Sequence, residues 1–220
     1  MSIDVKICGL SSPAALTAAI CGGASHVGFV FYPESPRFIA IERAAALAMM
    51  VPSSVKRVGL FVAPSDADLG ELLGRVPLDM IQLHGKETPE RVAAIGRRYG
   101  LPVIKAIAVY DPADVQDAAA FAPVADRLLF DARAPAGARR PGGNAVSFDW
   151  GLVKGFACRI PWFLAGGLNA ANVADAVGLS GAKALDVSSG VETAPGVKSP
   201  EKIRQFLRIA RSLDAIGAMK

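Results

Sequence analysis

A cysteine and an aspartate end two short apolar segments of this 220-residue chain, where they could exchange protons with a ligand. Cys8 lies in "VKICGL" and is followed by glycine, and Asp131 ends "DRLLFD". A thiolate can remove a proton from carbon if its pKa is lowered, and a protonated carboxyl group can supply one. Lys6, on the same strand face as Cys8, would favour the thiolate. The alternatives are a core cysteine and an aspartate that caps a helix or loop.

Two segments near the end of the chain combine glycine and serine in a way that suits a phosphate group. Their members are Gly166, Gly167 and Leu168 in "AGGLN", and Ser188, Ser189 and Gly190 in "DVSSGVE". Glycines let backbone N–H groups approach an anion, serines add hydroxyl donors, and a short helix after Ser188 would direct its positive end there. We also expect Asn169 to cap the next helix. The alternative is that both segments are ordinary turns.

Other polar side chains could orient a ligand. Arg37 lies in "YPESPR", where two prolines stiffen the chain, and its planar guanidinium suits a carboxylate. Gln82 and His84 in "IQLHG" share one face of a strand, so either could contact a substrate. A solvated surface arginine and a hydrogen-bonded structural histidine are the alternatives. His26, at the start of an apolar segment, is interpreted as structural.

Eight short apolar segments recur along the chain and indicate the strands that must position these residues. The predicted strands are 3–8, 26–31, 55–62, 78–83, 102–107, 126–131, 161–165 and 183–187, and the predicted helices are 12–20, 40–50, 65–76, 88–100, 169–179 and 199–213. Eight strand–helix units in about 220 residues are typical of a closed (β/α)₈ (TIM) barrel, in which catalytic groups lie at the C-terminal ends of the strands. An open doubly wound sheet is the structural alternative.

The composition favours one α/β domain over residues 1–220. Hydrophobic residues make up 52% of the chain and aromatic residues only 7%, so aliphatic side chains and alanine must build the core. No linker, low-complexity segment or change of composition marks a second domain. The longest irregular segment is 132–147, after the sixth predicted strand. A loop of this length is usually functional or disordered.

Charge and cysteine usage exclude several classes of partner. The net charge is only +4, and Lys and Arg are scattered, which favours a small anionic ligand over nucleic acid. The three cysteines form no CxxC pair, and no clustered ligand set predicts a metal site. The sequence has no apolar segment long enough to span a bilayer and no signal peptide. We therefore expect a cytoplasmic protein, monomeric or homodimeric, with no membrane partner.

Seven segments together resemble the phosphoribosylanthranilate isomerase family of tryptophan biosynthesis. They are "VKICGL", "GFVFYPESPRFI", "VGLFV", "IQLHG", "LLFDA", "FLAGGLNAANV" and "ALDVSSGVETAPGVKSPEKI", which extend over residues 5 to about 207. The combination of "KICG", "SPR" and "DVSSGVE" is specific, whereas the phosphate loops occur in many phosphosugar barrels. The resemblance implies a cofactor-free Amadori rearrangement of N-(5′-phosphoribosyl)anthranilate to 1-(2-carboxyphenylamino)-1-deoxyribulose 5-phosphate.

The resemblance also implies roles for single residues. Cys8 would be the general base, Asp131 the general acid, and Arg37 the partner of the anthranilate carboxylate. The segments 166–168 and 188–190 would hold the phosphate group. Asp186 matches an aspartate that lies near the sugar in the family, and its role is less defined.

The sequence departs from the family pattern at two places. "GGNA", residues 142–145, stands where the family usually has Gly-Gly-Thr-Gly. Asn144 could replace the threonine hydroxyl, but Ala145 lacks the freedom of glycine at positive φ. Glu34 stands where a lysine is frequent. Both departures concern the closure of the loop and leave the acid–base pair unchanged.

Two other functions are compatible with part of the pattern. Another phosphosugar barrel enzyme, such as an indole-glycerol-phosphate synthase, would share the phosphate loops but needs a lysine acid and a glutamate at strand ends. The first strand here ends in Cys8 instead. A barrel that binds a phosphate compound without turnover is the other alternative, and the presence of both Cys8 and Asp131 argues against it.

Overall fold

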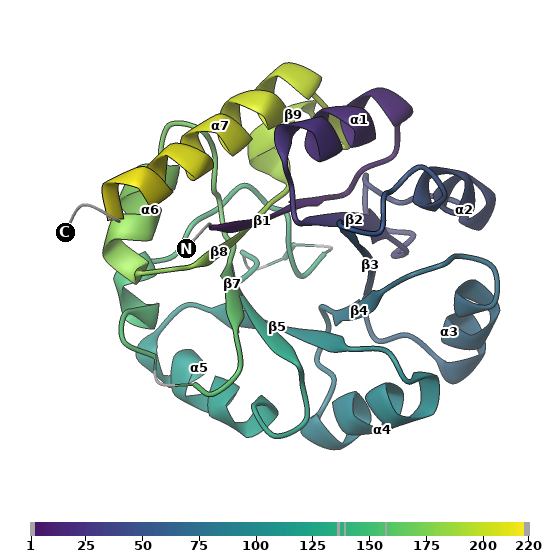
Figure 1. Ribbon diagram of the computed structural model, residues 1–220. Coiled ribbons are helices and arrows are strands. Elements are labelled where there is room, and N and C mark those ends of the chain that lie inside the picture. The colour runs from purple at the N-terminus through teal and green to yellow at the C-terminus, as the bar shows by residue number, and fades with distance from the viewer. Residues whose placement is uncertain (1–2, 136, 139, 157, 218–220) are drawn as a thin grey trace.

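Eight parallel strands close into a barrel in chain order, with β1 paired to both β2 and β8 (Figure 1). The computed structural model describes residues 3–135, 137–138, 140–156 and 158–217. The strands are β1 (Asp4–Cys8), β2 (His26–Val30), β3 (Lys56–Phe61), β4 (Met80–Leu83), β5 (Val103–Val109), β6 (Arg127–Ala132), β7 (Trp162–Leu164) and β8 (Ala184–Val187). Each predicted strand coincides with one of them. The predicted (β/α)₈ barrel is therefore confirmed, and the open sheet is wrong.

Helices surround the ring of strands (Figure 1). They are α1 (Pro13–Gly22), α2 (Ile41–Ala48), α3 (Asp66–Leu73), α4 (Pro89–Tyr99), α5 (Pro112–Asp117), α6 (Val173–Ser180) and α7 (Pro200–Gly217). Helix α5 is not among the predicted helices, because six residues are too few to show an apolar stripe. Its signal was a capping box, in which Asp111 and Asp114 each bond the other's backbone N–H. No helix in the described ranges is both long and apolar enough to cross a membrane.

Capping residues begin several helices where the sequence predicts them. The Ser12 hydroxyl accepts a hydrogen bond from Ala15 N in α1, and Ser199 accepts one from Lys202 N in α7. The expected cap at Asn169 is wrong. Its side chain accepts from Ala171 N, within a turn, and α6 begins only at Val173. The short asparagine side chain bonds the nearest free N–H, two residues on, before the helix can start.

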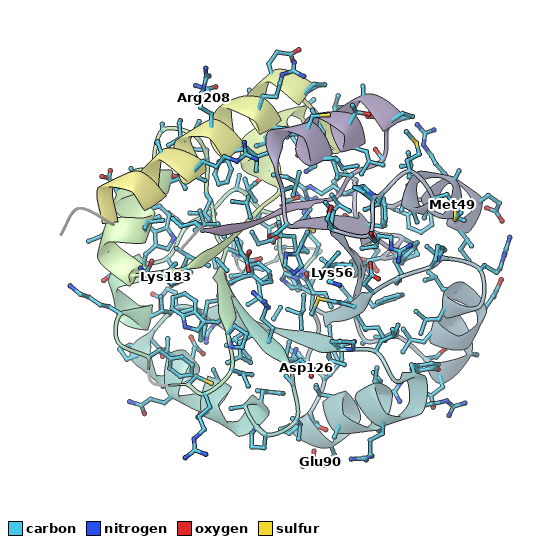
Figure 2. All side chains as sticks on the ribbon, in the orientation of Figure 1. Met49, Lys56, Glu90, Asp126, Lys183 and Arg208 are labelled. Atoms are coloured by element: carbon cyan, nitrogen blue, oxygen red, sulfur yellow. The ribbon has the colours of Figure 1, made fainter. Side chains whose placement is uncertain are left out.

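The described residues form three apolar clusters. A large cluster fills the space between strands and helices, a smaller one includes Val58, Leu129 and Phe163, and a third includes Cys8 at the end of β1. Side chains fill both the ring of strands and the space around it (Figure 2). His26, the first residue of β2, packs edge-on against Phe163 with ring centroids 5.1 Å apart. Burial lowers its pKa to about 3, so the ring is neutral. This environment agrees with the structural interpretation of His26.

Candidate active site

The C-terminal end of the barrel brings most of the predicted site residues together around two adjoining pockets. One pocket is lined by residues that include Cys8, Arg37, His84, Asp131, Asp186 and Ser188. The other is lined by residues that include Asp131, Gly166, Gly167, Leu168, Asp186, Ser188 and Ser189. Asp131, Asp186 and Ser188 line both. A single ligand could therefore contact the acid–base pair and the glycine loops at the same time.

Cys8 is buried at the end of β1, directly above a charged pair. A Cβ added at Gly28 would lie 3.1 Å from Cys8 Sγ and 3.2 Å from Lys6 Nζ, so this glycine makes room for both groups. Lys6 is fully buried, and its Nζ donates to Asp186 Oδ1 at 2.8 Å. Burial raises the pKa of the Cys8 thiol above its ordinary value, while the positive charges of Lys6 and Lys198 oppose the shift. The effect of burial on the Cys8 pKa is therefore larger than the opposite effect expected from Lys6.

Asp131 is bonded to two partners at the end of β6. Its Oδ1 accepts from Ala132 N at 2.9 Å, and its Oδ2 lies 3.2 Å from His84 Nε2. His84 Nδ1 lies 3.1 Å from Nε2 of Gln82, which is fully buried. The Gln82 Oε1 atom has no hydrogen-bond partner among the described residues. Gln82 and His84, which are expected to orient the substrate, thus form a chain of polar contacts that leads to Asp131.

Arg37 is a buried residue and not a solvated surface arginine. It is only 5% exposed, and its Nε and Nη2 donate to the two Glu192 carboxylate oxygens at 2.7 and 2.9 Å. One edge of the Arg37 guanidinium, which the sequence predicts to bind a ligand carboxylate, is therefore occupied by the carboxylate of Glu192. The Nη1–Nη2 edge still carries N–H donors, because a guanidinium has five. A Cβ at Gly143 would overlap Nη1, so this glycine lets the loop lie against the guanidinium.

Two charged residues beside Arg37 are not among the predicted site residues. Glu192 begins strand β9 (Glu192–Ala194), and Lys198 ends strand β10 (Val197–Lys198), which pairs antiparallel with β9. The Lys198 Nζ donates to Glu192 Oε1 at 2.6 Å. The signal that could have found them is a glutamate and a lysine six residues apart in the segment that follows the last barrel strand.

The glycines of the two predicted phosphate loops are required by close backbone contacts. Gly167 has φ +68°, and a Cβ there would lie 2.9 Å from Val146 O. A Cβ at Gly190 would overlap the Leu168 carbonyl oxygen, so the loops lie against each other. The predicted helix after Ser188 is only a 3₁₀ turn of three residues, Ser189–Val191. A turn this short has only a small macrodipole. The backbone N–H groups of the loops would therefore be the main donors to a bound phosphate.

The loop after β6 covers the mouth of the barrel. A Cβ added at Gly142 would lie 2.6 Å from His84 Nε2 and 2.7 Å from Asp131 Oδ2, so glycine lets the backbone reach the two side chains. Ala145 adopts φ +56° although it is not glycine. This conformation costs an L-residue about 1–2 kcal/mol. The Asn144 amide donates to Arg140 O at 3.2 Å. Ala145 therefore adopts a left-handed backbone conformation at a cost in strain. Glu34, the other departure from the family pattern, is exposed.

A closed (β/α)₈ barrel with titratable groups and glycine loops at its C-terminal mouth defines a barrel enzyme of the kind that binds phosphorylated small molecules. The family model described as "N-(5'phosphoribosyl)anthranilate (PRA) isomerase" matches residues 5–208. The chain belongs to this family, as the resemblance predicts. It catalyses the Amadori rearrangement of N-(5′-phosphoribosyl)anthranilate to 1-(2-carboxyphenylamino)-1-deoxyribulose 5-phosphate in tryptophan biosynthesis. The alternatives of an indole-glycerol-phosphate synthase and of a barrel without turnover are therefore wrong.

Individual relatives agree over nearly the whole chain. The N-(5′-phosphoribosyl)anthranilate isomerase of Paramagnetospirillum magneticum is 56% identical over 211 residues, which cover 96% of this chain and 98% of the relative. The dimeric isomerase of Thermotoga maritima, solved as engineered monomers, is 34% identical, with a TM-score of 0.82 and coverage of 96% and 99%. A phosphoribosylanthranilate isomerase in complex with reduced 1-(o-carboxyphenylamino)-1-deoxyribulose 5-phosphate has 34% identity, a TM-score of 0.83 and the same coverage.

Proposed function

We propose that Cys8 is the general base and Asp131 the general acid of this rearrangement. The observation that carries the proposal is their placement: both side chains are buried and line one pocket, which also contains Arg37 and adjoins the glycine loops. A substrate whose carboxylate is bound at Arg37 and whose phosphate is bound at the glycine loops would have its sugar between Cys8 and Asp131. Binding at both ends would orient the reacting carbons.

The proposed reaction needs two proton transfers before the final tautomerisation, which moves a third proton from the 2′-hydroxyl to C1′. Asp131 donates its proton to the ribose ring oxygen as the C1′–O bond breaks, which leaves a cationic Schiff base between C1′ and the anthranilate nitrogen. The Cys8 thiolate then removes the proton from C2′, and the electrons of that bond neutralise the Schiff base to an enolamine. The enolamine tautomerises to the ketone. The positive charge of the Schiff base favours the thiolate beside it, which offsets the effect of burial on the thiol.

His84 and Gln82 are proposed to position the proton of Asp131. A protonated Asp131 would donate to His84 Nε2, so the imidazole proton would then be on Nδ1, facing Gln82. The acceptor that Nδ1–H needs is the amide oxygen, and rotating the Gln82 amide by 180° would bring Oε1 to it. The lack of a partner for Oε1 among the described residues supports this second orientation. Asp186, which lines both pockets, is proposed to contact the sugar and to hold Lys6 below Cys8.

The segments 166–168 and 188–190 are proposed to bind the substrate phosphate. Replacing Gly167 with valine should raise KM on the order of tenfold or more, about 1.4 kcal/mol, because the side chain would meet Val146 O and displace the loop. Gly181→Val is the matched control. Gly181 has a similar φ of +72° with no atom within 4 Å of an added Cβ, so KM should not change. Steady-state kinetics of both variants test the site, and an equal effect on KM would contradict it.

Arg37 is proposed to bind the anthranilate carboxylate with its Nη1–Nη2 edge. Arg37→Ala should lose about 2–3 kcal/mol of transition-state stabilisation, which is about a 30- to 160-fold decrease in kcat/KM. Arg37→Lys should recover only part of it, since an ammonium is a point charge and lacks the planar fork that can bond Glu192 along one edge and a ligand carboxylate along another. The measurement is kcat/KM with the substrate and with an analogue that lacks the carboxylate. If both compounds lose the same factor in Arg37→Ala, Arg37 does not bind the carboxylate.

We further propose that residues 1–220 act as one catalytic domain, as a monomer or homodimer in the cytoplasm. The dimeric state of the Thermotoga maritima isomerase supports the homodimer.

A further inference from the structure

Lys198 is a buried cation that the proposed reaction does not use. Its side chain is 1% exposed, at the end of the β9–β10 hairpin. The Nζ atom donates to Glu192 Oε1 at 2.6 Å, to Ser188 O at 2.9 Å and to Ser188 Oγ at 3.1 Å. These three contacts match the three donors of an ammonium group. Burial of a lysine in this way is costly unless its charge is compensated, so the position calls for an explanation.

The arrangement around Glu192 places one carboxylate between two cations. Glu192 bonds Arg37 through two N–H groups and Lys198 through one, so the Arg37–Glu192–Lys198 cluster has a net charge of +1. The Arg37–Glu192 pair alone would be neutral. A buried glutamate beside the guanidinium holds its plane but also repels a ligand carboxylate, and this repulsion is strong where water is largely excluded.

We propose that Lys198 is a positioning residue that keeps the Arg37–Glu192 pair net positive, so that Arg37 can bind the substrate carboxylate. The inference rests on the proposed role of Arg37. It explains why a glutamate lies beside Arg37: Glu192 orients the arginine, and Lys198 cancels the negative charge that this orientation brings. The contact of Lys198 with Ser188, whose hydroxyl donates to Cys8 O at 3.1 Å, connects the cluster to the end of β1.

The charge of the cluster should depend on pH. The charged and titratable groups around the Lys198 ammonium are Glu192, Arg37 and Cys8, and the Lys202 ammonium donates to Glu192 O at 2.6 Å. Burial lowers the pKa of Lys198 to about 8, against the opposing effect of Glu192. Lys198 is protonated below this value, where the cluster carries +1, and neutral above it, where the cluster carries no net charge. KM for the substrate should therefore rise above about pH 8.

Three variants separate a charge role from a packing role. Lys198→Met reduces the cluster to zero charge and should raise KM on the order of tenfold. The double variant Lys198→Met/Glu192→Gln restores +1, since Arg37 is then the only charged member, and should recover most of this loss. Glu192→Gln alone carries +2, and its amide oxygen can still accept one N–H of Arg37, so it should raise KM less than Lys198→Met does. Circular dichroism checks that each variant folds, and if Lys198→Met does not fold, the other two variants still carry the test.

The outcomes distinguish the inference from the proposal on which it rests. If the double variant has a KM as high as that of Lys198→Met, Lys198 has only a packing role and the inference is overturned. An analogue that lacks the carboxylate should show none of these changes in KM. If Arg37→Ala affects the substrate and this analogue equally, the error lies in the role of Arg37 instead.

Discussion

Replacing Cys8 with serine should lower kcat by at least ~10²–10⁴-fold, while KM changes little. Serine keeps the approximate shape of the side chain, but its hydroxyl is too weakly acidic to ionise near neutral pH. The base that removes the C2′ proton would therefore be lost, whereas the groups proposed to bind the carboxylate and the phosphate would remain. Steady-state kinetics that follow the decrease in anthranilate fluorescence measure both constants. Wild-type turnover in Cys8→Ser would make Cys8 a core residue and require another base at the mouth.

A thiol-directed alkylating reagent gives an independent check. Cys21 is exposed and Cys158 is partly exposed, so the experiment uses a Cys21→Ser/Cys158→Ser background in which only Cys8 can react. In that background, alkylation should abolish activity, and bound product should slow the reaction.

Asp131→Asn should decrease kcat as far as Cys8→Ser, by at least ~10²–10⁴-fold, because an amide cannot supply a proton to the ring oxygen. The amide can still bond His84, so the local geometry is largely retained. The residual activity should rise with pH as the Cys8 thiolate forms. In kcat/KM, which reports the free enzyme, its midpoint should lie above the usual pKa of a thiol, because burial raises the pKa of this thiol.

Asp175→Asn is the matched control for this change. Asp175 lies exposed on α6, so the same loss of a carboxylate there should leave kcat unchanged. A value of kcat in Asp131→Asn within a few-fold of the wild type would contradict the role of Asp131 as the acid. A falling pH profile in that variant would contradict the role of Cys8 as the base.

Local sequence was sufficient to predict most of the elements. Each barrel strand is an apolar segment buried on both faces, and such segments are recognisable without any tertiary information. The eight repeats indicated closure, and the position of Cys8 and Asp131 at strand ends predicted that both would reach one mouth. The short helix α5 lay beyond this kind of prediction, because its six residues show no apolar period. The start of α6 was also not predictable from the sequence. The Asn169 side chain could either cap a helix or close a turn with Ala171 N, and it does the second.

The charges of the site could not be derived from the sequence. From the sequence, Lys6 is expected to favour the Cys8 thiolate, but the burial of Cys8 in the barrel raises the pKa of the thiol. Arg37 is expected to bind a ligand carboxylate, but Glu192, 155 residues further along the chain, occupies one edge of its guanidinium. Strand patterns depend on near neighbours, whereas electrostatic energies depend on which buried groups meet and how much water they exclude. Only the folded chain brings Arg37, Glu192 and Lys198 into contact.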